Sequence, residues 1–346
     1  DGVNTSSTEK FTVNINDVNE IPTANDATVS LSEDASNTDT VATVSANDVD
    51  TGTTLTYSIT NGNTDYDSDT NLPFAINPST GEITVNDSDD IDYEVAANTT
   101  KSFSLEVTVT DNGTGNLSDT AIITVNLTNE NDNTPTLNQN SFTVAEGTDI
   151  VATLIATDLD GDSVDIDIYG VGIDDFEFSI SALEELSFNT TPDFENPTDA
   201  DTNNVYEIDV SLDDGTNFDV VGVTITVTNL NDNSPIISSN GGGLTATIAV
   251  DENQTSVTTV VATDADVSDT VGYSISGGAD QADFDINPST GVLTFDTAPD
   301  FETKTSYEVV VQASDSTNVD TQTITVNIND LNDNTPVVTP GQSGSI

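Results

Sequence analysis

The feature that most constrains the fold of this chain is a strict alternation of apolar and polar residues. In “SFSLEVTVT” (102–110) every second residue is Phe, Leu or Val, and the same pattern recurs at 206–212 and 307–313. A period of two places alternate side chains on the same face of an extended strand. Each stretch therefore predicts a β-strand with one buried face, although so acidic a chain would otherwise suggest disorder.

A second feature divides the chain into repeats of about one hundred residues. The turns “NENDNTP” (129–135), “NLNDNSP” (229–235) and “DLNDNTP” (330–336) are nearly identical, and “DVNEIP” (17–22) is a shorter version. Their asparagines, Asn19, Asn131, Asn231 and Asn332, are separated by 112, 100 and 101 residues. Because this spacing is the length of one small domain, we expect the turns to lie between successive domains.

The first interval contains seven predicted strands. They fall at 27–32, 39–46, 55–60, 73–77, 82–85, 102–110 and 119–127. Seven short alternating strands without a sustained helical period indicate a β-sandwich. The polar loop 61–71 accounts for the extra length of this interval, and “SALEELSF” (181–188) is predicted to form a short turn. The predicted core includes Tyr57, Phe74, Tyr273 and Phe284.

The turns predict five segments. These are 1–19, the last strand of a preceding repeat; 20–130, a first repeat; 131–230, a divergent second repeat; 231–331, a third repeat; and 332–346, a linker with the start of a following repeat.

The composition excludes several classes of function. The 346 residues include 62 Asp and Glu, three Lys, and no Arg, His, Cys, Met or Trp, for a net charge of −59. Without His or Cys there is no Ser-His-Asp triad, thiolate nucleophile or ordinary zinc site, and we expect no enzyme. The charge argues against nucleic acid and anionic membrane surfaces. No apolar run is long enough to span a bilayer, so we expect no direct membrane insertion by this fragment.

Four acidic signatures recur in the same order in each repeat. The first is a Glu near the first strand (Glu33, Glu146 and Glu252), and the second is an Asp-x-Asp pair (Asp48/Asp50, Asp158/Asp160 and Asp264/Asp266). The third is an Asp-aromatic-Glu motif (Asp92/Glu94, Asp193/Glu195 and Asp300/Glu302), and the fourth is an Asp that ends the sixth strand (Asp111, Asp214 and Asp315). A lone acidic turn is usually just solvated. Copies at domain spacing, with matching acids elsewhere, indicate a metal site.

In this combination of motifs the chain resembles tandem cadherin repeats of bacterial type, from Asp1 to about Pro336. The resemblance implies an all-β fold of tandem seven-stranded Greek-key β-sandwiches, cadherin- or immunoglobulin-like, joined end to end by calcium-binding linkers. It also implies that the acidic residues converge at each junction and hold about three Ca²⁺ ions there. The upper repeat gives its Glu and Asp-x-Glu, the linker gives Asn and Asp, and the lower repeat gives the remaining acids.

Carried over to this sequence, the resemblance defines two complete junctions and two half junctions. The first complete junction comprises Glu33, Asp92, Glu94, Glu130, Asn131, Asp132, Asn133, Asp158, Asp160 and Asp214. The second comprises Glu146, Asp193, Glu195, Asn231, Asp232, Asn233, Asp264, Asp266 and Asp315. The half junctions comprise Asn19, Asp48, Asp50 and Asp111 at the first linker, and Glu252, Asp300, Glu302, Asp330, Asn332 and Asp333 at the last.

Three linker residues depart from the family pattern. Asn129 and Asn229 stand where many cadherin linkers have Asp, and Glu20 stands where Asp is usual. The physical chemistry nevertheless agrees with the resemblance. Ca²⁺ binds six to eight oxygens, which carboxylates and amides close to the backbone supply. Apart from Glu130, each complete junction gathers seven carboxylates, which about three divalent ions would nearly neutralise.

These features predict a calcium-dependent adhesion protein of the cell surface or the extracellular space. The repeats would act as a calcium-rigidified, rod-like extender or as a homophilic adhesive module, with calcium and other copies of the chain as partners. The alternative is a polysaccharide-binding module of an extracellular protein or enzyme. A glycan site needs exposed aromatic side chains, for which Tyr66 and Tyr169 are the few candidates.

Overall fold

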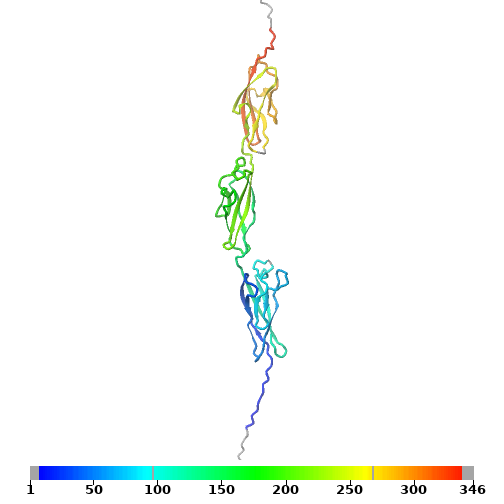
Figure 1. Ribbon diagram of the computed structural model, residues 1–346. Coiled ribbons are helices and arrows are strands. Elements are labelled where there is room, and N and C mark those ends of the chain that lie inside the picture. The colour runs from blue at the N-terminus through cyan, green and yellow to red at the C-terminus, as the bar shows by residue number, and fades with distance from the viewer. Residues whose placement is uncertain (1–7, 96, 267–268, 337–346) are drawn as a thin grey trace, which may run out of the picture. The chain divides into compact units, whose positions relative to one another are not determined.

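The computed structural model describes residues 8–95, 97–266 and 269–336 (Figure 1). In this part of the chain the structure is all-β, with three short 3₁₀ turns and no α-helix. The chain divides into two compact units. Among the described residues, one unit holds those up to Asn138 together with Ala156–Asp165 and Ser211–Asp219, and the other holds Gln139–Ile155, Ile166–Val210 and those from Val220 onward.

The strands of the first repeat match the predicted strands closely. They are β1 (Thr23–Ala24), β2 (Ala27–Ser32), β3 (Thr40–Thr43), β4 (Ala46–Asn47), β5 (Thr56–Asn61), β6 (Phe74–Ile76), β7 (Glu82–Val85), β8 (Ser102–Thr110) and β9 (Ser118–Thr128). The predicted strand 39–46 is in fact two strands, because β3 pairs with β7 whereas β4 pairs with β1.

The next two repeats follow the same order. The second contains β10 (Thr136–Leu137), β11 (Ser141–Ala145), β12 (Ile150–Thr153), β13 (Ala156–Thr157), β14 (Asp165–Ile168), η1 (Asp175–Glu177), β15 (Phe178–Ile180), β16 (Glu185–Phe188), β17 (Val205–Asp213) and β18 (Phe218–Thr228). The third contains β19 (Ile236–Ile237), η2 (Ser239–Gly241), β20 (Thr245–Asp251), β21 (Ser256–Thr259), β22 (Ala262–Thr263), β23 (Gly272–Gly277), η3 (Gln281–Asp283), β24 (Phe284–Ile286), β25 (Val292–Phe295), β26 (Ser306–Ser314) and β27 (Val319–Asn329).

Each repeat builds the same pair of sheets. In the first repeat a four-stranded sheet has the order β2-β9-β8-β5 and a three-stranded sheet has the order β3-β7-β6. The orders β11-β18-β17-β14 with β12-β16-β15, and β20-β27-β26-β23 with β21-β25-β24, repeat this arrangement. In each repeat the first long strand is parallel to the last strand, and most other pairs are antiparallel. The predicted fold class, a tandem series of Greek-key sandwiches, is therefore confirmed.

The inward faces of the two sheets form the core. Leu105, Val107 and Val109 on β8 are fully buried, and so are Ala121, Ile123 and Val125 on β9. Phe74 and Phe284 are buried, and Tyr57 and Tyr273 pack against the cores of their repeats, as predicted. The alternation read from the sequence thus separates the core from the solvent face.

In the first and third repeats a glycine directly follows a strand, β5 in the first and β23 in the third, and begins the connection to the next strand. Gly62 has φ +80°, and a Cβ there would lie 1.9 Å from the carbonyl oxygen of Ser104. Gly278 has φ +104°, and a Cβ there would lie 2.6 Å from the carbonyl oxygen of Glu308. Only glycine fits such a close approach at positive φ. In the first repeat the glycine starts the long loop that joins β5 to β6.

Two further predictions can be compared with the described residues. The predicted short turn at “SALEELSF” is confirmed only for residues 181–184, because Glu185–Phe188 form β16, which pairs antiparallel with β15. Residues 8–16 of the predicted terminal strand form no strand, while residues 1–7 and 337–346 lie outside the described residues. A strand at this end of the chain would have no partner for its backbone hydrogen bonds. The boundaries of all five segments stay predictions.

Replacing Leu105 with Ala tests the position of the core. Leu105 is 0% exposed on β8, so Leu105→Ala should destabilise the first repeat by about 2–5 kcal/mol. Hydrogen exchange followed by mass spectrometry should show faster exchange in β8 and β9 but not in β26 and β27. Ile122→Ala, at a side chain that is 37% exposed, is the control and should change exchange little. Equal effects of the two variants would contradict the assignment of the buried face.

Candidate metal centres in the acidic clusters

A buried glutamate fixes each linker to the repeat before it. Glu146 is 3% exposed; its Oε2 accepts the N–H of Phe194 at 2.6 Å and its Oε1 accepts the N–H of Leu230 at 2.6 Å. Glu33 accepts the corresponding N–H groups of Tyr93 and Glu130, and Glu252 accepts those of Phe301 and Leu331. One carboxylate therefore joins the Asp-x-Glu motif to the linker in every repeat.

The Asp-x-Asp pair leaves one carboxylate oxygen without a partner in every repeat. The N–H of the second Asp donates to Oδ1 of the first, over 2.8 Å for Asp48, 2.9 Å for Asp158 and 3.1 Å for Asp264. The other oxygen, Oδ2, of each first Asp is buried and has no hydrogen-bond partner. A buried acceptor without a partner is costly, so its recurrence at the same place indicates a ligand position.

The late aspartates of the second and third repeats have the same character. Asp315 Oδ1 accepts the N–H groups of Thr317 and Asn318, both at 2.6 Å, while its Oδ2 is buried without a partner. Asp214 Oδ1 likewise accepts two backbone N–H groups, and its Oδ2 has no partner. Backbone N–H groups of the local turn therefore satisfy one oxygen of each carboxylate and leave the other without a partner.

The first acidic cluster, which comprises the residues predicted for the first complete junction, lies within one compact unit. Glu33, Asp92 and Glu94 place one carboxylate oxygen each within 4.8 Å of one another, and so do Glu94, Asp132 and Asp160. The Oδ2 of Asp160 accepts the N–H groups of Asp132 at 3.0 Å and Asn133 at 2.8 Å. The sequence-predicted acids of the linker and of both repeats are therefore brought together.

The second acidic cluster, which comprises the residues predicted for the second complete junction, lies within the other unit. Glu146, Glu195, Asp232 and Asp266 place their carboxylate oxygens within 4.8 Å of one another. Asn233 donates its N–H to Asp266 at 3.0 Å and its Nδ2–H to Glu195 at 3.0 Å. Asp193 accepts the N–H of Glu195 at 3.1 Å, which places it at the same cluster.

The two half junctions contain the same local parts. At the first linker, Asn19 donates to Asp111 at 2.8 Å, and the N–H of Glu20 donates to Asp50 at 2.9 Å. At the last linker, Asp300 accepts the N–H of Glu302 at 3.0 Å, and Asp333 accepts Nδ2–H of Asn253 at 2.5 Å. Glu302, Asp330 and Asn332 are exposed, whereas Glu94 and Glu195 in the complete clusters are half-buried.

The clusters raise the pKa of the carboxyl groups that they enclose. Burial, followed by the charge of Glu33, raises the pKa of Glu94 to about 7. Burial, followed by the charge of Glu146, raises the pKa of Glu195 to about 7. The same causes raise the pKa of Asp132 and Asp232. Like charges in a partly dry site favour the protonated form, so a cation would be needed to keep every group ionised at neutral pH.

The comparison with protein families agrees with this repeated geometry. The family model of the cadherin domain matches residues 27–128 and 246–329, which together are more than half of the chain. The chain belongs to the cadherin family. The topology of the second repeat, which has the same sheet orders, extends the cadherin arrangement to residues 136–228.

Several cadherins are similar over most of this chain. Cadherin EGF LAG seven-pass G-type receptor 2 of Mus musculus is 30% identical over 317 residues, which are 85% of this chain. Protocadherin Fat 4 of Homo sapiens is 30% identical over 331 residues, which are 89% of this chain. The chain spans only 10% and 6% of the length of these two relatives.

Solved cadherin structures share the fold. A structure of protocadherin gamma B2 extracellular cadherin domains 3–6 has a TM-score of 0.56 and 25% identity, covering 93% of this chain and 76% of that one. The structure of mouse cadherin-23 EC22-24 has a TM-score of 0.54 and 22% identity, covering 91% of this chain and 100% of that one. The second likeness shows the fold alone.

Sequence reasoning missed three residues at the clusters. Asn217 donates Nδ2–H to the Oδ1 of Asn131 at 3.1 Å, and Asn318 donates to the Oδ1 of Asn231 at 3.3 Å. Both asparagines follow the late Asp by three residues in the pattern Asp-x-Thr-Asn, a signal that the sequence contains. Asp269 also belongs to the second cluster. Its Oδ2 is buried without a partner, and the charges of Asp266 and Asp315 add to the effect of burial, which raises its pKa.

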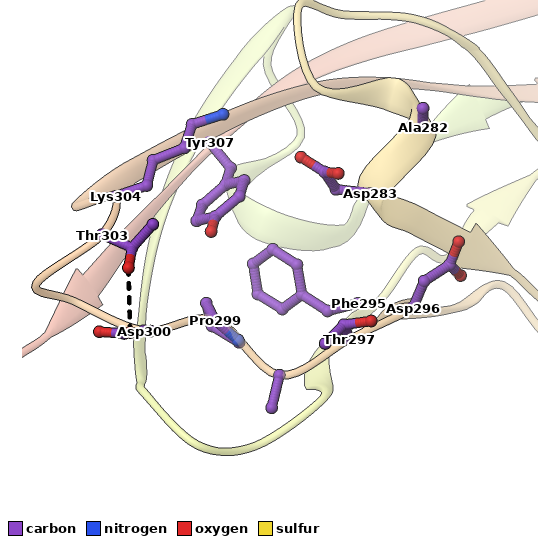
Figure 2. Close-up of a pocket in the computed structure, with 11 residues that line it drawn as sticks. Ala282, Asp283, Phe295, Asp296, Thr297, Pro299, Asp300, Thr303, Lys304 and Tyr307 are labelled. Atoms are coloured by element: carbon purple, nitrogen blue, oxygen red, sulfur yellow. Dashed lines mark hydrogen bonds between the residues drawn. The ribbon is translucent and has the colours of Figure 1, made fainter.

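A separate pocket in the third repeat contains aromatic side chains (Figure 2). Phe295 is 3% exposed and belongs to the core, and Tyr307 packs against the same core. Lys304 lies 4.3 Å from the centre of the Tyr307 ring and forms an ion pair with Asp280. The rings are therefore parts of the sandwich, and the lysine is already paired.

The raised pKa values predict an unusual dependence of stability on pH. In metal-free protein the free energy of unfolding should fall as the pH rises from about 4.5 to about 7. The folded state keeps protons on Glu94 and Glu195 that the unfolded state has already lost. Urea titrations at pH 5, 6, 7 and 8 measure this trend. Asp214 and Asp315 have lowered pKa values, so they change the free energy of unfolding only below about pH 4, outside this range.

The control for this trend is the variant Glu94→Gln/Glu195→Gln. It should flatten the dependence of stability on pH, because neither side chain can then hold a titrating proton. Stability of the parent protein that rises steadily between pH 5 and 7 would contradict the description of the clusters.

Proposed function

We propose that this chain is a calcium-dependent adhesion segment of a cell-surface or extracellular protein. Cadherin domains in general bind calcium, and the chain belongs to that family. The observation that supports calcium most strongly is the set of buried carboxylate oxygens without partners. Asp158, Asp214 and Glu94 provide them in the first cluster, and Asp264, Asp315 and Glu195 provide them in the second.

The donor set fits Ca²⁺ better than other common metals. The clusters contain carboxylates and amide oxygens, which are the ligands of hard cations, and the chain has no His or Cys for zinc. Bound Ca²⁺ would supply the positive charge that the clusters lack. The proposed ligands are the residues predicted for each complete junction, at about three ions per junction. The half junctions, with fewer acids, would bind more weakly.

The proposed mechanical role follows from the connectivity of the ligands. Each complete cluster draws on the end of one repeat, the linker and the start of the next. Crowded carboxylates repel one another without a cation, so ion binding would restrict the motion of successive repeats and favour a rod-like extender. Such an extender can also offer its sides to other copies of the chain, as in homophilic adhesion.

The extracellular location is part of the same proposal. The similar structure of protocadherin gamma B2 consists of extracellular cadherin domains, and Ca²⁺ outside cells reaches the concentrations that weak extracellular modules need. No helix in the described residues has the length and apolar character needed to cross a membrane. The bacterial type predicted from composition stays a prediction, since the relatives reported above are animal proteins. The absence of catalysis also stays a prediction.

The polysaccharide alternative has no specific observation in its favour. Tyr66, one of its two aromatic candidates, packs with its ring centre 5.6 Å from that of Phe103 and belongs to the core boundary. Tyr169 is 46% exposed, but a single exposed ring makes no aromatic platform. We therefore retain adhesion as the proposed function.

Asp232→Ala tests the ligand assignment at the second junction. Asp232 lies with Glu146, Glu195 and Asp266 in one carboxylate group, so its loss should weaken Ca²⁺ binding there at least tenfold in calorimetry. Binding at the first junction should not change. Glu106→Ala, on β8 and outside both clusters, is the control and should keep the parent affinity. Similar losses in both variants would mean that calcium binds diffusely to the acidic surface.

Chelation tests the mechanical role. With millimolar Ca²⁺, small-angle scattering should give the distribution of interatomic distances of a single elongated shape. Complete removal of calcium should broaden the features of that distribution, because the repeats are then joined only by flexible linkers and take many relative angles. An unchanged profile after metal removal, verified by metal analysis, would contradict a calcium-stiffened rod.

A further inference from the structure

The long loop of the first repeat contains an acidic cluster of its own, away from the linkers. The loop, residues 62–73, joins β5 to β6. Asp65, Asp67 and Asp69 each place one carboxylate oxygen within 4.8 Å of the others. By sequence alone, this stretch is only a polar insertion. An acidic group on a loop is common without a metal, so the residue beneath it decides the interpretation.

That residue is Asp90, which is fully buried under the loop. Its exposed fraction is 0%, and its Oδ1 accepts the N–H groups of Tyr66 at 2.5 Å and Asp67 at 3.2 Å. Its Oδ2 is buried and has no hydrogen-bond partner. A buried carboxylate with one unsatisfied oxygen therefore lies directly beneath the acidic loop.

In the other two repeats, acids in the loop between the corresponding strands have hydrogen-bond or ion-pair partners. Asp174 and Asp175, in the second repeat, are buried, and each of their four oxygens accepts a backbone N–H. Asp280, in the third repeat, binds Lys304 and the N–H of Glu308. In the first repeat Lys101 instead donates to the carbonyl oxygen of Tyr93. Among the described residues, Lys304–Asp280 is the one ion pair.

The local geometry of the loop suits a hard cation. Asp65 accepts the N–H groups of Ser68 at 2.6 Å and Thr70 at 2.9 Å, which curls the loop around its carboxylate. Acids at every second residue followed by a sharp turn are the arrangement of the first six positions of an EF-hand loop. Thr70, at the sixth position, has φ +83°. Position twelve is Ile76 rather than Glu, so a further carboxylate would have to come from another segment, and Asp90 is the buried acid beneath the loop.

We propose that Asp65, Asp67, Asp69 and Asp90 bind one Ca²⁺ ion within the first repeat, separate from the ions of the junctions. Four carboxylates and the neighbouring backbone carbonyls or waters can provide the six to eight oxygens that Ca²⁺ requires. The ion would satisfy the buried Oδ2 of Asp90 and join the loop to the core, against which Tyr66 packs. The third repeat needs no such ion, because Lys304 neutralises Asp280.

The test uses the full chain and two probes, Ca²⁺ in equilibrium dialysis and Tb³⁺ luminescence. Tb³⁺ replaces Ca²⁺ and emits when a tyrosine lies close to it. Asp67→Asn/Asp69→Asn keeps the side-chain oxygens that accept the N–H groups of Asp69 and Asn71 but removes two charges. The matched control, Glu82→Gln/Glu106→Gln, removes two charges from β7 and β8. We expect one Ca²⁺ fewer per chain in the loop variant and the parent number in the control.

Two more variants assign that ion to the loop. Tyr66→Phe should reduce Tb³⁺ emission while the number of bound Ca²⁺ ions stays the same. Asp90→Asn keeps an oxygen for the N–H groups of Tyr66 and Asp67 and should also lose one ion. A loop variant that binds as many ions as the parent, or emission that Tyr66→Phe does not change, would overturn the proposal.

A junction background separates this proposal from the proposed function. In a chain with Asp132→Ala and Asp232→Ala, the loop should still bind one ion and emit through Tyr66. Loss of the loop ion in this background would overturn the loop site. Unchanged binding at the junctions in the same background would count against the junction assignment alone, because the loop signal is measured separately.

Discussion

The crowding of buried carboxylates around the linkers is the constraint on which the rest of the structure depends. Glu33, Glu146 and Glu252 each use both oxygens to accept backbone N–H groups from two segments. These bonds fix the path of the chain where one repeat ends. They also bring the neighbouring acids close together, because the same turn that the glutamate holds contains the Asp-x-Glu motif. Structural order and electrostatic repulsion at the linkers thus have one cause.

The chain has too few cations of its own to relieve that repulsion. It contains three lysines for 62 acidic residues. Lys304 is paired with Asp280, and Lys101 donates to a backbone carbonyl oxygen and lies 5.0 Å from the Tyr93 ring. Backbone N–H groups satisfy many carboxylate oxygens, but they leave the Oδ2 atoms of Asp158 and Asp264 without partners. Cations from solution are the remaining source of positive charge, at the linkers and in the loop above Asp90 alike.

Much of the fold could be predicted because its signal is local. The alternation in β8 and β9 marks the buried face directly, and both strands lie within one residue of their predicted bounds. The split of the predicted strand 39–46 could not be predicted, because it depends on which partner each half finds across the sandwich. For the site, the acids were found by their repeated order. Asn217, Asn318 and Asp269 were missed because their roles depend on contacts with the linker and its acids.

The sequence by itself determined that the chain forms repeated β-sandwiches and that acids recur at fixed places in each. Period and spacing are properties of neighbours along the chain, so they need no tertiary information. Only the tertiary structure decided which oxygens are left without partners. Asp90 lies more than twenty residues from Asp65 in sequence, and it faces the loop only because the sandwich places its segment beneath Tyr66 and Asp67. Burial and hydrogen-bond satisfaction belong to the folded arrangement, because they depend on every atom around a group.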